Sequence, residues 1–224
     1  MSDAPEVGVL TGEWDGGALP YRIGHRKLGM WLFIMSDALT FAALLIAYSY
    51  ARFSSQDWPT PFPFNPSIIF STVMTLVLLS SSLTMVFAVD AGKRGKKRLA
   101  RYWIWATMFF GSMFIILHMT EWNHLMSEGL YFNSLPQEWL KVWPNASILF
   151  GSAFFGITGL HMFHVFTGVI YLGLIATRIR KMTPEDIETC GLYWHFVDLV
   201  WMFVFPLIYI MSVDMDHKLT NLPH

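Results

Sequence analysis

The chain has 224 residues, of which 54% are hydrophobic and only 14% are charged, and its formal net charge is −1. Soluble domains carry about 25% charged residues, so this composition excludes an ordinary soluble domain and indicates a membrane protein. The single cysteine, Cys190, excludes an internal disulfide and a cysteine-pair metal site. The acidic first twenty residues lack the basic start and apolar core of a signal peptide.

Five apolar runs are each long enough to cross a bilayer, which takes about 20 residues. They predict an all-α membrane protein with spans at about 28–50, 66–89, 102–122, 147–177 and 193–211. The segments WPTPFPFNP, KRGKKRLAR and TPEDIETCG and the longer loop 123–146 are predicted to connect them. Pro206 predicts a kink in the last span. We expect one transmembrane domain at 25–213, between a flexible cytoplasmic tail at 1–24 and a C-terminal tail at 214–224.

The basic residues predict the orientation of the spans. Twelve of the fifteen Lys and Arg residues fall on one side of the predicted topology, and only Arg52, Lys141 and Lys218 fall on the other. By the positive-inside rule the N-terminus is then cytoplasmic and, after five crossings, the C-terminus is periplasmic. The basic run at 93–101 is interpreted as an anchor to anionic lipid, and no nucleic-acid partner is expected.

Ionisable residues within the spans are costly in lipid and normally face a protein interior. Seven such residues lie within the spans or at their ends: Asp37, His118, Glu121, His161, His164, His195 and Asp198. Asp37 lies about 15 Å along its helix from Lys27, near the bilayer midplane. His161 and His164 share one helix face at a similar depth, so we expect Asp37 to pair with them.

The remaining buried residues repeat the same spacing, because His118 precedes Glu121, and His195 precedes Asp198, by three positions. Three interpretations are open: polar contacts that hold helices together, at roughly 0.6 kcal/mol each, a haem or metal site, or a proton path. A haem held by two histidines needs imidazoles that face each other, and zinc needs three or four converging ligands. The predicted depths of these histidines differ, which favours polar contacts between helices and no metal site.

Four stretches resemble subunit III of the haem–copper terminal oxidases. They are LGMWLFIMSDALTF, HMTEWNHLMSEG, FGSAFFGITGLHMFHVFTGVIYL with its His-x-x-His pair, and YWHFVDLVWMFVFPLIY. With the second span they cover nearly everything from residue 25 to residue 211. Two positions depart from the family pattern: Asp37 stands where Glu is more common in cytochrome c oxidases, and Met162 stands where Gly is usual. Five spans instead of seven resemble the short bacterial members.

The resemblance implies an accessory subunit of a proton-pumping oxygen reductase in a bacterial inner membrane, with no catalytic residues of its own. Haems and copper would belong to subunits I and II, which would be its partners, and a respiratory supercomplex is a further partner. The family also binds phospholipid, in a cleft between the first two conserved helices and the rest, and it supports proton uptake. Arg178 matches a position suited to a lipid phosphate, which a guanidinium binds in bidentate fashion.

Three alternatives stand beside this interpretation. The first is subunit III of a quinol oxidase, or the related small protein associated with nitric oxide reductase. The second, of a different class, is a stand-alone b-type cytochrome that uses the histidine pairs as haem ligands. The third is a small transporter, suggested by the buried acids and by Pro206, although the sequence shows no inverted repeat of the kind that many transporters have.

Overall fold

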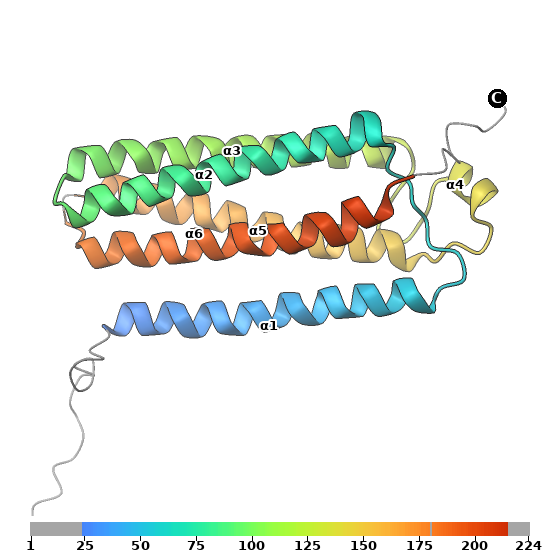
Figure 1. Cartoon of the computed structure of the whole chain (residues 1–224), viewed down its shortest axis with the longest axis horizontal. Coiled ribbons are helices and arrows are strands. Elements are labelled where there is room, and N and C mark those ends of the chain that lie inside the picture. Colours follow the sequence, from blue (N-terminus) through green and yellow to red (C-terminus); the bar gives the residue numbers. More distant parts are fainter. Residues whose placement is uncertain (1–23, 180, 215–224) are drawn as a thin grey trace, which may run out of the picture.

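The computed structural model describes residues 24–179 and 181–214, and within these ranges the chain is helical, with isolated backbone bridges but no strand (Figure 1). In the described part of the chain, five helices are long and apolar enough to cross a membrane, which confirms the predicted number of spans. They contain α1 (His25–Ser54), α2 (Ile69–Lys93) after the short η1 (Phe64–Ile68), α3 (Lys97–Ser127), α5 (Leu149–Arg178) and α6 (Pro184–Val204). The predicted tails at 1–24 and 214–224 lie outside the described residues, apart from Gly24 and Asp214.

The last spanning helix begins earlier than predicted. The segment TPEDIETCG was predicted to be a connection, and this is wrong, because α6 starts at Pro184. The Thr183 hydroxyl accepts a hydrogen bond from the Asp186 backbone N–H (3.2 Å), and the Asp186 carboxylate accepts one from the Thr183 N–H (2.9 Å). This capping box, with proline at the first helical position, satisfies the free amides of the first turn. A further short helix, α4 (Gln137–Val142), lies in the long loop predicted at 123–146.

Pro206 changes the winding of the last span. After Val204 the helix continues as a π-helical turn, η2 (Phe205–Tyr209), and then as a short 3₁₀ turn, η3 (Ile210–Ser212). Proline lacks an amide hydrogen, so an ordinary α-helical bond cannot form there, and a π-type turn is a common way to accommodate the loss. As a consequence, the side chains that follow Pro206 point in different directions from those they would have in a regular α-helix.

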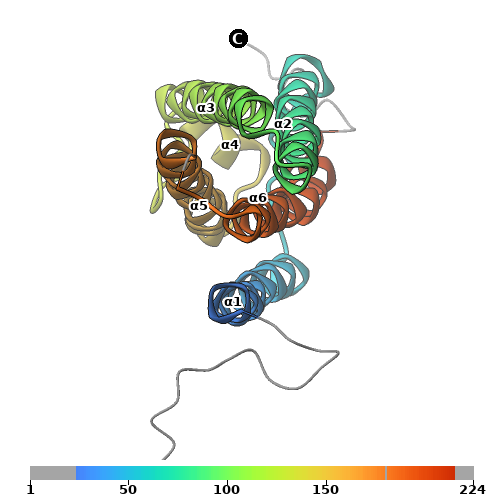
Figure 2. The ribbon, with the colours of Figure 1, turned by 90° about the vertical axis from the view of Figure 1, so that its left-hand side faces the viewer.

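Four of the spanning helices form a bundle, and the fifth lies beside it. Helices α2, α3, α5 and α6 surround a common core, whereas α1 packs mainly against α6 and α5 on the outside of this bundle (Figures 1 and 2). In the most apolar stretch of α1 only 6% of the residues are buried, against 56% in the last span. The resemblance implied a division between the first two helices and the rest. In this structure the division lies between α1 and the other four spanning helices.

Polar contacts hold α1 to α6 and to the segment that follows it, near both ends of α1. At its N-terminal end, Arg26 pairs with Asp186, and Lys27 lies 3.3 Å from Glu188. At its C-terminal end, the Tyr48 hydroxyl lies 3.3 Å from that of Ser212, and Arg52 donates to the Ser212 hydroxyl (3.1 Å). Because α1 buries so little apolar surface against the bundle, these contacts are prominent among those that position it.

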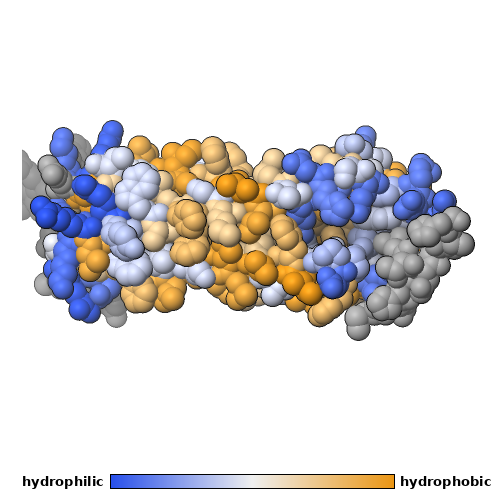
Figure 3. Space-filling view, turned by 90° about the horizontal axis from the view of Figure 1, so that it is seen from above, coloured by the Kyte–Doolittle hydropathy of each residue, from blue (hydrophilic) through white to orange (hydrophobic). Residues whose placement is uncertain are grey.

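The surface has an apolar belt between two polar ends (Figure 3). Large apolar side chains such as Leu39, Ile46 and Phe109 are more than 60% exposed on the outer faces of the helices, as expected of residues that face lipid. The start of α1, the α2–α3 turn and the α5–α6 connection lie at the same end of the molecule (Figure 1). We call this the basic end, because these segments carry most of the Lys and Arg residues, and the opposite end the far end.

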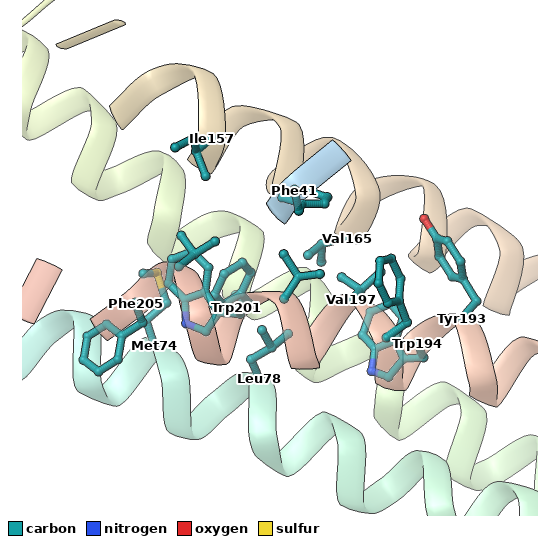
Figure 4. Close-up of a cluster of buried hydrophobic side chains, with 14 of the residues drawn as sticks. Phe41, Met74, Leu78, Ile157, Val165, Tyr193, Trp194, Val197, Trp201 and Phe205 are labelled. Carbon is teal, nitrogen blue, oxygen red and sulfur yellow. The ribbon is translucent and has the colours of Figure 1, made fainter. Parts of the chain in front are cut away.

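Two tryptophans of α6 fill the centre of the bundle (Figure 4). The indole of Trp194 lies between Gly111 of α3 and Gly168 of α5, and its Nε1 donates to the Ser81 hydroxyl of α2 (2.9 Å). Trp201 is also fully buried, and its Nε1 donates to Thr75 of α2 (3.0 Å). Trp194 thus contacts all three of the other bundle helices, which fixes their relative positions around α6.

Candidate functional site

A carboxyl–imidazole pair joins α1 to α5 near the middle of both helices. His164 Nε2 lies 3.3 Å from Asp37 Oδ1, and His164 Nδ1 lies 2.8 Å from the Leu160 carbonyl oxygen. A carbonyl can only accept, so Nδ1 carries a hydrogen. A hydrogen bond between Nε2 and Oδ1 then needs one further proton, on the imidazole or on the carboxyl. Phe41 of α1 packs edge-on against the imidazole, at 5.5 Å between ring centroids.

The structure separates the two histidines that share this helix face. His161 does not reach Asp37; its ring is fully buried and packs against the Trp201 indole at 4.9 Å between centroids. Neither ring nitrogen of His161 makes a hydrogen bond within the described residues. Of the predicted cluster, Asp37 and His164 are brought together and His161 is not.

A second polar cluster ties α2, α3 and the end of the last span. Glu121 accepts hydrogen bonds from the Ser71 hydroxyl (2.8 Å) and from the Tyr209 hydroxyl (2.7 Å). His118 Nδ1 lies 3.8 Å from Glu121, one turn away on α3. Sequence reasoning missed Ser71 and Tyr209 as partners, although the helical spacing of Ser71 and Thr75 marks the face of α2 that lies against neighbouring helices.

The third predicted pair lies between α6 and α2. His195 Nδ1 is 2.6 Å from the Ser82 hydroxyl, whereas Asp198 is buried and neither of its carboxyl oxygens has a hydrogen bond of ordinary geometry within the described residues. The predicted lipid-phosphate residue, Arg178, is exposed at the last turn of α5, at the basic end. The residues that the structure describes contain no group of three or more His, Cys, Asp and Glu side chains placed to hold a metal ion.

The positions of the histidines bear on haem binding. Both ring nitrogens of His164 already face oxygen atoms. The rings of His118 and His161 both pack against Trp201, at centroid distances of 5.5 and 4.9 Å, so the indole fills the space that a haem would need between them. Packed this way, these side chains act as contacts between helices.

Comparison with known proteins shows the family. The family model described as cytochrome c oxidase subunit III matches residues 18–213. This chain belongs to the cytochrome c oxidase subunit III family. The cytochrome c oxidase subunit 3 of Alkalihalophilus pseudofirmus is 30% identical over 195 residues, which cover 84% of this chain and 88% of that protein. The cytochrome c oxidase subunit 3 of Bacillus subtilis is also 30% identical over 195 residues, at 84% and 87% coverage.

Relatives from quinol oxidases match equally well. The cytochrome bo(3) ubiquinol oxidase subunit 3 of Pseudomonas putida is 34% identical over 191 residues, which cover 83% of this chain and 86% of that protein. The chain is therefore subunit III of a haem–copper oxidase and a multi-pass membrane protein, and its relatives include subunits of both cytochrome c and ubiquinol oxidases. The resemblance carried by the four sequence stretches is confirmed.

Proposed function

We propose that this subunit III is a non-catalytic accessory subunit that packs against subunit I of a proton-pumping oxygen reductase, with subunit II in the same complex, in a bacterial inner membrane. The observation that carries the proposal is the use of the buried polar residues within the chain. Glu121 binds Ser71 and Tyr209, and Asp37 binds His164, so these groups connect helices and are not directed at a cofactor. Haems and copper then reside in the partner subunits.

We assign phospholipid binding to two places. A groove of about 230 Å³ runs between α1 and α6, and its walls are apolar side chains that include Phe41, Leu45, Phe196 and Phe203. An acyl chain suits this groove, because the groove lies in the apolar belt and presents almost no polar group. Arg178, exposed at the basic end, is suited to a lipid phosphate, since its guanidinium can donate two parallel hydrogen bonds.

We also propose a supporting role in proton uptake, and the position of α1 beside the bundle supports it. An accessory subunit that fixes α1 and its lipids beside a catalytic partner holds the proton-entry surface of that partner in one arrangement. Replacement of Asp37 by Asn, which keeps the shape and removes the charge, would then reduce the turnover lifetime of the complex more than its initial rate.

The decisive experiment is purification of the complex in a mild detergent through a tag on this chain, followed by a redox difference spectrum and identification of the subunits. We expect haem to co-purify together with larger subunits, and the isolated chain to be colourless. A Soret band in the isolated chain would refute the proposal and favour the b-type cytochrome. A copper-bearing subunit II would identify a cytochrome c oxidase, and a subunit II without copper ligands a quinol oxidase.

A further inference from the structure

A groove along the α2–α6 contact leads from the basic end toward the interior. Its volume is about 330 Å³, and its lining includes the charged residues Asp90, Lys93 and Glu188 as well as His195. Lys93 and Glu188 form an ion pair of 3.4 Å. His195 lies seven residues beyond Glu188 on α6, which is about 10 Å farther from the basic end. The groove therefore connects charged surface groups to an imidazole within the apolar belt.

The imidazole is joined to a hydroxyl on the facing helix. His195 Nδ1 and the Ser82 oxygen are 2.6 Å apart. Other hydroxyls on α2 donate to carbonyls of their own helix, and some, such as Ser71, also bond to a neighbouring helix. Ser80, for example, donates to the Leu76 carbonyl (2.8 Å). The hydrogen bond of Ser82 joins α2 to His195 on α6. A hydroxyl can accept one hydrogen bond while it donates another, so it can pass a proton between two neighbours.

The Ser82 hydroxyl also faces a buried carboxyl. It interacts with Asp198, which lies one turn beyond His195 on α6 and is only 5% exposed. Neither oxygen of Asp198 makes a hydrogen bond of ordinary geometry within the described residues. A buried carboxylate is costly unless hydrogen bonds satisfy it, and polar groups in protein interiors are nearly always hydrogen-bonded. Hydrogen bonds between helices therefore do not account for Asp198, in contrast to Glu121, whose two oxygens accept from Ser71 and Tyr209.

We propose that Asp198 is a proton-binding site that exchanges with the basic-end surface through Ser82 and His195. When the Ser82 hydroxyl forms a hydrogen bond with Asp198, the carboxyl passes its proton to the Ser82 oxygen, Ser82 passes its own to Nδ1 of His195, and Nε2 releases one to water in the groove. Asp198 ends as a carboxylate, Ser82 as a hydroxyl and His195 as a neutral imidazole, and one proton has left. The reverse sequence reloads the carboxyl. This deepens the proposed function, on which it rests, since it gives a chemical role to residues of an accessory subunit.

The test is infrared spectroscopy of the purified complex during transfer from H₂O to D₂O. The carbonyl band of protonated Asp198 is assigned by its loss in Asp198→Asn. Its deuterium shift is then followed in Ser82→Ala and in His195→Gln, with Ser80→Ala as the matched control on the same helix. We expect exchange about 100-fold slower in the first two variants, the scale of one lost proton-transfer group, and the wild-type rate in the control. Unchanged exchange in Ser82→Ala and His195→Gln would overturn the relay.

A second measurement needs no substitution at Asp198, in case the Asn variant does not assemble. A hydrophobic carbodiimide, which forms a stable adduct with protonated carboxyls, is added to the wild-type complex, and the peptide that contains Asp198 is examined by mass spectrometry. Labelling of Asp198 in the wild type supports a protonated carboxyl at this site, and an unlabelled Asp198 refutes it. Retention of haem-bearing partners is recorded in every sample. Loss of those partners from the wild type refutes the accessory-subunit proposal, whereas unchanged exchange in an intact complex refutes only the relay.

Discussion

The notch formed by Gly111 and Gly168 around Trp194 predicts a large penalty for one added methyl group. A Cβ at Gly111 would lie 2.5 Å from Cη2 of Trp194 and 2.8 Å from Cζ2. Carbon atoms pack at about 3.5–4.0 Å, so Gly111→Ala requires the indole to retreat by roughly 1 Å. The adjacent edge of the ring restricts this movement, because Gly168 packs so closely against it that an added Cβ there would lie only 2.9 Å from Cζ3. The bond from Nε1 to Ser81 restrains it as well.

The expected magnitude follows from overpacking a well-filled core, which costs about 1–3 kcal/mol. Gly111→Ala also gains helix propensity, up to about 1 kcal/mol. Gly156→Ala separates the two effects: Gly156 is in a spanning helix as well, but an added Cβ there would meet nothing within 4 Å. We expect Gly156→Ala to be neutral or slightly stabilising, and Gly111→Ala to be less stable than Gly156→Ala by about 2 kcal/mol.

The assay is unfolding in mixed micelles titrated with dodecyl sulfate, followed by tryptophan fluorescence and by subunit retention in the complex. The decisive comparison repeats Gly111→Ala in a Trp194→Phe background, where the shorter ring no longer reaches the added methyl. The penalty of the alanine should disappear there, which gives a coupling of about 2 kcal/mol in the double-mutant cycle. An equal penalty in both backgrounds, or equal stability of the Gly111 and Gly156 variants, would show that the notch does not determine the packing.

Three further predictions use the same unfolding assay. Tyr209→Phe removes one of the two hydroxyls that donate to Glu121 and should cost about 0.5–2 kcal/mol; Tyr50→Phe, at a side chain that is 74% exposed, is the control and should cost nothing measurable. Asp37→Ala removes the contact to His164 and should cost about 0.6–1.7 kcal/mol, and equal losses from Asp37→Ala in the wild type and in a His164→Ala background would contradict the pairing. Thr183→Ala removes the N-cap of α6 and should cost about 0.5–2 kcal/mol, with faster amide exchange confined to the first turn; wild-type exchange there would argue against the capping box.

The number of spans could be predicted from the sequence because uninterrupted apolar runs leave few other options for a chain in lipid. The residues at which the spanning helices begin and end were harder to predict. The segment TPEDIETCG was interpreted by its polarity, although Thr183, Pro184 and Asp186 carry a helix-start pattern that explains why α6 begins there. Polarity alone does not distinguish a loop from the first turns of a helix that protrudes beyond the apolar belt.

The buried polar contacts could be predicted only in part. Depth along the helices placed Asp37 at the level of His161 and His164. Those two histidines are separated by only about 60° around the helix axis, so a small rotation of α5 decides which one faces α1. The contact from Tyr209 to Glu121 was beyond prediction for another reason: it follows the π-helical turn at Pro206, which shifts the facing of every later side chain.

The separate position of α1 has a consequence for how the protein is made. The contacts that hold α1 join residues 127 to 164 positions apart in the chain, from Asp37–His164 in the middle to Tyr48–Ser212 near the far end. A ribosome adds about 5–20 residues per second, so the first helix inserted waits roughly 10–30 s in the lipid before its partners emerge. During that interval Asp37 faces the membrane without His164. Biogenesis of this subunit therefore includes a stage at which a carboxyl-bearing helix must be tolerated alone, and the last helix synthesised completes the attachment of the first.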